Sequence, residues 1–266
     1  MVGADGRGVH KVTRGRAYVA ESDPDWSPDG GRIVFDRSFS CPDPLTLCTA
    51  IWVVNADGSG ERRLTPQTPG IGELSPTWSP DGRRIAYVRS DDRSETSDLY
   101  LMNADGSAKR RLTHVRDAEE PAWSPDGKRI ALSHDGDIFV LDLDSGSLQR
   151  LTKTPLIESY PDWSPDGKRI AYELNNPTPP GRDVQEYDAF VMDADGTHQR
   201  RLSRRRDTDG HPVWSRGGEL IAYTSDAGPL LGDSIAIVIV EADTGDFVRR
   251  IRPPGIDLYP IDWTGG

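Results

Sequence analysis

The chain has 266 residues, a formal net charge of −11 at pH 7, and 27 Gly and 21 Pro residues. The acidic balance argues against a nucleic-acid partner, which calls for a basic face, and against an anionic membrane surface. There is no run of 18 apolar residues to insert into a membrane, and the first residues, MVGADGRGVHKV, lack the apolar core of a signal peptide. The many glycines and prolines are typical of a turn-rich, all-β chain.

A five-residue phrase, WSPDG, recurs along the chain. It occurs at 26–30, 78–82, 123–127 and 163–167, with a variant, WSRGG, at 214–218 and a last tryptophan, Trp263, near the end. The tryptophans are spaced by about 40 to 52 residues, and a period of that length indicates a repeat architecture.

Each repeat predicts four short strands, which are clearest in the second repeat. Residues 73–78 lead into the SPDG turn, and residues 84–88 (RIAYV) follow it. Residues 99–102 (LYLM) come next, and after an NADG turn residues 109–113 (KRRLT) close the unit. Asp-Gly supplies the positive φ that tight hairpins require, so these turns favour consecutive antiparallel strands.

The second and third strands of the repeats are nearly all apolar, as in IFVL at 138–141 and IAIVIV at 235–240. Continuous apolar runs indicate burial on both faces. The arginines of the fourth strand suit an exposed outer edge, where charge deters edge-to-edge pairing. Four-stranded sheets that are covered on both faces and repeated radially predict an all-β fold of the β-propeller type.

Five repeats are complete. They begin near Glu21, Glu73, Ala118, Glu158 and Asp209. Residues 1–13 match the end of a repeat, and residues 257–266 match the start of one. We therefore expect a single propeller domain over 1–266, of the six-bladed type, with five complete blades and a partial sixth built from both termini. The strands missing from this sixth blade suggest a fragment of a longer chain.

Two cysteines, Cys41 and Cys48, stand seven apart in CPDPLTLC. Metal-ligand spacing would be tighter, and no second Cys or His pair accompanies them. The spacing favours a small disulfide loop, which would indicate an oxidising, extracytoplasmic location.

The phrase WSPDGKRIAY, followed by NADG and RRLT, resembles the TolB-like propeller repeat, the WD40-like type of bacterial periplasmic proteins. The resemblance covers almost the whole chain, although Arg216-Gly217-Gly218 replaces Pro-Asp-Gly in the fifth repeat. It implies a six-bladed, periplasmic or secreted propeller that binds protein partners. In this family the propeller also occurs beside other domains, including the catalytic domain of prolyl oligopeptidase-like enzymes.

An acidic residue stands three positions before the first-strand proline in most repeats. These acids are Glu21, Glu73, Glu158, Asp209 and Asp257, and in the third repeat, where Ala118 takes the position, Glu119 and Glu120 lie beside it. We expect Glu21, Glu73, Glu119, Glu158, Asp209 and Asp257 to surround the channel mouth, on the same face as the variable loops between the second and third strands. Variable loops on a rigid scaffold are common binding surfaces.

Like charges this close repel one another unless something compensates them, and two interpretations remain open. In one, each carboxylate accepts a hydrogen bond from backbone N–H groups of a neighbouring blade. In the other, the ring binds a cation, for which calcium suits an all-oxygen site, or a peptide with a basic segment. Tyr160 and Tyr259 precede first-strand prolines and could add an aromatic surface at the same mouth.

No catalytic motif is present: there is no G-x-S-x-G, and the five histidines are scattered. We therefore predict a non-enzymatic module that binds a protein or peptide. Two alternatives stay open. One is the propeller domain severed from a prolyl oligopeptidase-like peptidase, and the other is a metal-dependent propeller hydrolase or lyase.

Overall fold

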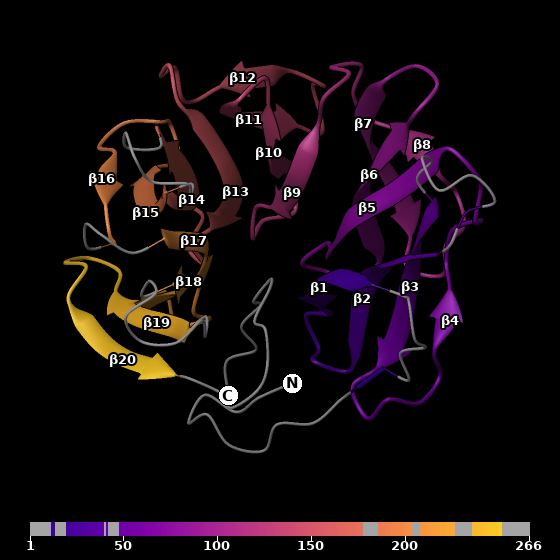
Figure 1. Ribbon diagram of the computed structural model, residues 1–266, viewed down its shortest axis with the longest axis horizontal. Helices are drawn as coiled ribbons and strands as arrows, with labels where there is room; N and C mark the ends of the chain where they lie inside the picture. Colours follow the sequence, from indigo (N-terminus) through magenta and orange to yellow (C-terminus); the bar gives the residue numbers. More distant parts are fainter. Residues whose placement is uncertain are drawn as a thin grey trace.

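A computed structural model describes residues 12–13, 20–39, 41, 48–177, 186–203, 208–226 and 236–251. These residues form twenty β-strands arranged radially around a common centre (Figure 1). No helix that could cross a membrane is found in this part of the chain. The predicted all-β propeller fold is confirmed.

The strands fall into five consecutive units of four, called blades 1 to 5. Blade 1 contains β1 (Glu21–Trp26), β2 (Arg32–Ser38), β3 (Cys48–Asn55) and β4 (Arg62–Arg63). Blade 2 contains β5 (Ile71–Trp78), β6 (Arg84–Asp91), β7 (Thr96–Asn103) and β8 (Arg110–Arg111). Blade 3 contains β9 (Glu119–Trp123), β10 (Arg129–His134), β11 (Asp137–Asp142) and β12 (Leu148–Arg150). Blade 4 contains β13 (Ile157–Trp163), β14 (Arg169–Asn176), β15 (Glu186–Asp193) and β16 (Arg200–Arg201). Blade 5 contains β17 (Thr208–Trp214), β18 (Leu220–Asp226), β19 (Ala236–Glu241) and β20 (Phe247–Ile251).

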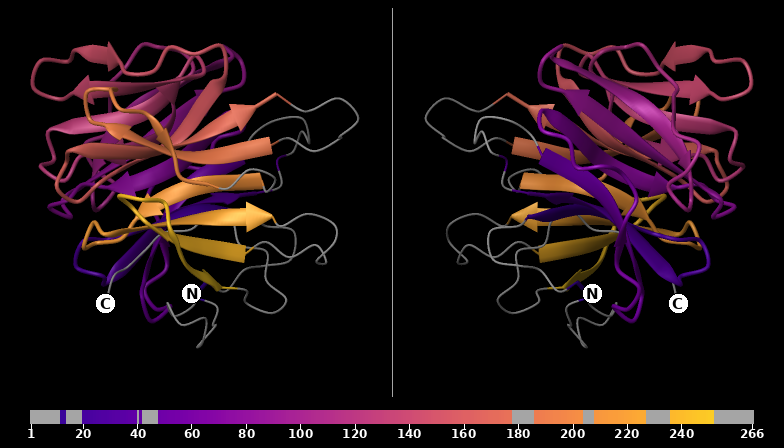
Figure 2. Two further views of the ribbon diagram at one scale, coloured as in Figure 1. Left: turned by 90° about the vertical axis from the view of Figure 1, so that its left-hand side faces the viewer. Right: turned by 90° about the vertical axis from the view of Figure 1, so that its right-hand side faces the viewer.

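Within each blade, the strands pair antiparallel in chain order, with the first strand innermost (Figure 1). Blades 1 and 2 are also joined by a short parallel pairing of β3 with β5. The strands run across the thickness of the molecule from one face to the other (Figure 2). Because their direction alternates, the SPDG and NADG-type turns share one face, here called the turn face. The second strands end and the third strands begin on the other face, called the loop face.

The core lies between the blades, and the repeated tryptophan is part of it. Trp78, for example, is 4% exposed and belongs to a cluster with Val34 and Ile51 of blade 1. In blades 1 to 4, the arginine that begins the second strand stacks on the tryptophan of the next blade. The four pairs are Arg32–Trp78, Arg84–Trp123, Arg129–Trp163 and Arg169–Trp214, with guanidinium-to-centroid distances of 4.6, 5.0, 4.5 and 4.7 Å. Apolar burial and a cation–π contact thus stabilise the packing of each of blades 1 to 4 against the next blade.

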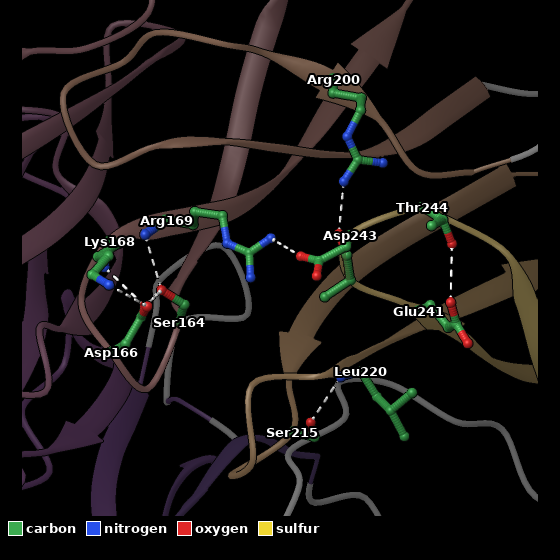
Figure 3. Close-up of polar contacts among 11 residues, drawn as sticks. Ser164, Asp166, Lys168, Arg169, Arg200, Ser215, Leu220, Glu241, Asp243 and Thr244 are labelled. Atoms are coloured by element: carbon green, nitrogen blue, oxygen red, sulfur yellow. Dashed lines mark hydrogen bonds and ion pairs between the residues drawn. The ribbon is translucent and has the colours of Figure 1, made fainter.

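The intact SPDG turn and its WSRGG variant are held differently. In blade 4, Ser164 Oγ donates to Asp166 Oδ1 at 2.7 Å and accepts the Arg169 N–H at 2.9 Å (Figure 3). In blade 5, Ser215 still accepts the Leu220 N–H at 3.1 Å, but glycine stands where the aspartate would be. Arg216, in place of the proline, instead donates across to the Pro28 carbonyl of blade 1 at 2.8 Å.

Residues 12–13 contact blade 1 in the way that one blade's outer strand contacts the next. A Cβ added to Gly58 would lie 2.7 Å from the Val12 carbonyl oxygen, just as one on Gly106 would lie 2.8 Å from that of Leu64. Residues 1–11 and 252–266, including Asp257, are outside the described residues. The partial sixth blade therefore stays a prediction, and the placement of Val12 supports it.

Cys41 and Cys48 form a disulfide with Cα atoms 5.7 Å apart. A cross-link over a loop of this size stabilises the folded state by about 2.5 kcal/mol, because it lowers the conformational entropy of the unfolded chain. We expect the Cys41→Ala/Cys48→Ala double variant to lose that much unfolding free energy in urea titrations. Reductant should lower the wild-type midpoint to that of the variant and leave the variant unchanged. A reductant effect of equal size on both proteins would contradict this.

Candidate functional site

The innermost strands of the five blades line a central, open-ended cavity of about 150 Å³. Its lining comes from the same three positions of each strand: the proline, the residue before it and the residue after it. The lining residues are Asp23, Pro24, Asp25, Ser75, Pro76, Thr77, Glu120, Pro121, Ala122, Tyr160, Pro161, Asp162, His211, Pro212 and Val213. The repeated scaffold thus presents five different side chains at one equivalent position.

A β-bulge in every innermost strand produces this lining. The pairing with the second strand shifts register at the proline in all five blades. Proline has no N–H to offer the ladder, so a bulge accommodates it, and the bulge re-aims the neighbouring side chain. The residue before each proline has a positive φ. These residues, called the pre-proline ring, are Asp23 (45°), Ser75 (46°), Glu120 (49°), Tyr160 (51°) and His211 (53°).

Carboxylates of one blade hold the pre-proline backbone of the next. The Ser75 N–H donates to Asp36 Oδ2 of blade 1 at 3.2 Å. The Tyr160 N–H donates to Glu120 Oε2 of blade 3 at 2.8 Å. The His211 N–H donates to Glu173 Oε2 of blade 4 at 3.0 Å. These bonds satisfy N–H groups that the bulge removes from the strand ladder, and they link neighbouring blades around the cavity.

The same carboxyl groups are strongly perturbed by their surroundings. Burial, reinforced by the nearby charge of Asp23, raises the pKa of Asp36 to about 7. Burial likewise raises the pKa of Glu120 and that of Glu173 to about 7. At neutral pH these acids are therefore only partly ionised, and a cation entering the cavity would favour their charged form. Perturbed acids around a cavity are typical of functional sites, although structural networks also produce them.

An aromatic pair forms the wall contributed by blades 4 and 5. The Tyr160 and His211 rings have centroids 3.8 Å apart and an interplanar angle of 58°. Burial lowers the pKa of His211 to about 4, so its imidazole is neutral at pH 7. Burial and the charges of the Glu120, Asp23 and Glu173 carboxyls raise the pKa of Tyr160.

The acids predicted to surround the channel mouth do not contribute to this lining. Glu73 and Glu158 are fully buried: Glu73 Oε1 pairs with Arg89 of its own blade at 2.7 Å, and Glu158 Oε2 accepts the Thr152 hydroxyl of blade 3 at 3.2 Å. Glu21 pairs with Arg37 at 2.5 Å, and Asp209 is 1% exposed. Glu119 is exposed and lies outside the lining, and Asp257 is outside the described residues.

The described acids singled out from the sequence all lie on innermost strands; they are Glu21, Glu73, Glu119, Glu158 and Asp209. The predicted position lies before the bulge and outside the lining, whereas the residue two places later lines the cavity. Asp23, Ser75 and His211 were not proposed as site residues, and the proline that follows each of them was the available signal. Within the described ranges, no group of three or more His, Cys, Asp or Glu side chains could hold a metal ion. The calcium expectation therefore rests on the sequence pattern alone.

A family model described as the TolB beta propeller domain matches residues 14–134 and 74–180. Among curated proteins, an uncharacterized peptidase of Bacillus subtilis (strain 168), YuxL, is 31% identical over 86 residues, which cover 32% of this chain and 12% of YuxL. The Tol-Pal system protein TolB of Thioalkalivibrio sulfidiphilus (strain HL-EbGR7) is 44% identical over 52 residues, which cover 20% of this chain and 11% of that protein. The chain thus spans about a tenth of either relative.

Among solved structures, the crystal structure of TolB from Acinetobacter baumannii superimposes with a TM-score of 0.71 at 23% identity. The match covers 90% of this chain and 55% of that one. At 23% identity this similarity shows the fold alone, and membership of the family is shown by the family model.

Proposed function

This chain belongs to the TolB beta propeller domain family, and from that premise we propose that it is a non-enzymatic module that binds a protein or peptide. The partner would approach the loop face and enter the central cavity. One observation carries this proposal: five different side chains occupy one equivalent position around a cavity on a repeated scaffold. Such an arrangement offers a rigid frame with a variable contact surface.

The charge of the lining favours a partner with a basic segment. Among the residues that the structure describes, four carboxylic side chains line the cavity, namely Asp23, Asp25, Glu120 and Asp162, and no lysine or arginine does. A net charge of −11 for the whole chain would also steer a basic partner toward it and keep nucleic acids away. The family and the Cys41–Cys48 disulfide together favour a periplasmic or extracellular location.

A cavity-blocking variant tests this function. Thr77→Phe would place a phenyl ring into the cavity from β5, and Arg83→Phe would add the same ring to the exposed turn face. Peptides selected from a displayed decapeptide library on the wild-type chain should be rich in Lys or Arg. We expect Thr77→Phe to weaken their binding at least tenfold, measured by fluorescence polarisation, while Arg83→Phe leaves it unchanged.

Both variants should first be shown to keep the wild-type circular dichroism spectrum and a cooperative thermal transition. Equal binding by the two variants would mean that the peptides bind elsewhere. Selected peptides without basic residues would contradict the proposed partner chemistry.

The second candidate function is that of the propeller domain of a peptidase. The observation in its favour is the similarity to the peptidase YuxL over 86 residues. The coding sequence on either side of this chain discriminates between the two candidates. A downstream hydrolase domain with a G-x-S-x-G nucleophile motif would support the peptidase, in which the cavity would serve as a route for substrate.

A further inference from the structure

The residue type in the pre-proline ring varies between blades, whereas the residues that follow it in the strand and its own backbone conformation do not. In each blade the proline and the tryptophan two residues after it are the same. The residue before the proline is Asp, Ser, Glu, Tyr or His, although its backbone conformation hardly differs between blades. Folding alone does not require this variety, because one residue type would satisfy five equivalent backbone positions.

The backbone at this position favours glycine, and no blade has one there. A φ between 45° and 53° lies in the left-handed region, where a side chain costs about 1 to 2 kcal/mol. Such strain persists where the surrounding structure enforces it, and it gathers at functional sites. The side chains of the ring are therefore present despite an energetic penalty.

The ring divides the cavity into an acidic side and an aromatic side. Asp23 and Glu120 supply carboxylates, and Ser75 Oγ donates to Asp23 Oδ2 at 2.8 Å, which orients that group. Tyr160 and His211 supply the tilted pair of aromatic rings. Asp25 and Asp162 also line the cavity and accept the backbone N–H groups of Trp78 and Trp214, as Glu120 accepts that of Tyr160.

We propose that the pre-proline ring determines which ligand the cavity accepts, and that it selects the ammonium or guanidinium end of a Lys or Arg side chain, held between Asp23 and Glu120 and against Tyr160. The inference rests on the proposed function and names the group that the cavity recognises. A cation is attracted both to carboxylates and to the face of a phenol ring, and both interactions strengthen in a partly dehydrated cavity. An anion would find no oppositely charged side chain among the described lining residues, none of which is basic.

The test uses two blocked tripeptides that differ only in charge, acetyl-Gly-Lys-Gly-amide and its neutral norleucine twin, titrated into the isotope-labelled chain and followed by NMR. The wild-type chain should bind the lysine probe at least tenfold more tightly than the norleucine probe. Asp23→Gly and Tyr160→Leu should each abolish that preference. High salt would screen the attraction of the lysine probe in the wild-type chain and in the variants alike. All titrations are therefore run at the same low ionic strength.

A matched control separates binding from folding. Ala108 has the same backbone strain, with a φ of 52°, but lies in an exposed turn on the turn face. Asp23→Gly and Ala108→Gly should both leave the Tm unchanged or raise it by about 2 to 4 °C, since each relieves one strained residue. Only Asp23→Gly should change the lysine preference.

Two results would overturn the inference. One is an unchanged lysine preference in Asp23→Gly and Tyr160→Leu. The other is a fall in Tm of more than about 4 °C in Asp23→Gly, which would show that the side chain is kept for folding. If Thr77→Phe still blocks library peptides in either case, the proposed function stands and only the role of the ring fails. If Thr77→Phe has no effect, the proposed function itself fails.

Discussion

Raising the pH from 5 to 8 should lower the free energy of unfolding by at least about 3 kcal/mol and the Tm by about 6 to 12 °C. The reason is a set of buried carboxyls whose pKa values lie at about 7: Asp36, Glu73, Glu120 and Glu173. For Glu73, burial outweighs the attraction of Arg89. Most small proteins become less stable below pH 5, so a loss of stability toward pH 8 would be distinctive.

The sign follows from proton binding. Each of these carboxyls binds its proton more tightly in the folded chain than in the unfolded chain, where its pKa is about 4. The stability that the proton contributes is complete below that value and is lost as the pH rises through 7. His211 acts in the opposite direction between about pH 4 and 6.5, because its folded pKa is lowered to about 4. The effect of one histidine is smaller than that of four carboxyls, so the free energy of unfolding still falls as the pH rises from 5 to 8.

A single isosteric substitution isolates the effect. Glu173→Gln keeps an oxygen that can accept the His211 N–H, but it removes the titrating group. We expect it to raise the Tm at pH 8 and to change it little at pH 5, in thermal melts followed by circular dichroism. Asp144→Asn, an exposed change in a blade 3 turn, should have no pH-dependent effect. A Tm that rises from pH 5 to pH 8 would contradict the assignment of buried, protonated carboxyls.

Gly196→Ala should destabilise the chain by at least about 3 kcal/mol, whereas Gly146→Ala should cost only about 1 kcal/mol. Both glycines end turns between the third and fourth strands, and both have positive φ values, 89° and 72°. A Cβ on Gly196 would lie 2.6 Å from the Leu151 carbonyl oxygen of blade 3, which is backbone and cannot rotate away. A Cβ on Gly146 would meet nothing within 4 Å.

Both substitutions therefore carry the cost of placing alanine at a positive φ, and only Gly196→Ala adds a clash between neighbouring blades. Urea titrations give both free energies, and the difference between them is the cost of separating blade 4 from blade 3 at this point. Equal losses in the two variants would show that the blades can shift apart without penalty. We expect the two losses to differ by about 2 kcal/mol or more, because the Cβ on residue 196 would contact a backbone carbonyl, which cannot move aside as a flexible side chain can.

The local elements of this protein could be predicted because their signals act over a few residues. The Asp-Gly turns, the apolar second and third strands and the repeated tryptophan each specify one step of a blade, and the structure has all of them. The interpretation of WSPDG as a core tryptophan followed by a tight turn needs no information from distant residues. Repetition then implied that the blades surround a common centre.

The cavity could not be predicted in the same way. Glu73 and Glu158 were expected at the channel mouth because they stand at the start of the first strand, the innermost one. In a regular strand, side chains two positions apart lie on the same face. The bulge at the proline breaks this alternation, so these acids are buried outside the lining and the pre-proline residues line the cavity instead. A bulge exists only relative to the paired strand, and the sequence of one strand does not state its register with another.

The sequence by itself determined the blade, its turns, its apolar faces and the propeller that they build, since these depend on short-range conformational preference and on period. Only the tertiary structure decided which side chains meet. It brought Tyr160 of blade 4 beside His211 of blade 5, placed Glu120 under the backbone of the next blade, and buried carboxyls deeply enough to move their pKa values to about 7. Those properties depend on distances and burial between residues some forty to fifty positions apart, roughly one repeat, and arise only when neighbouring blades pack together.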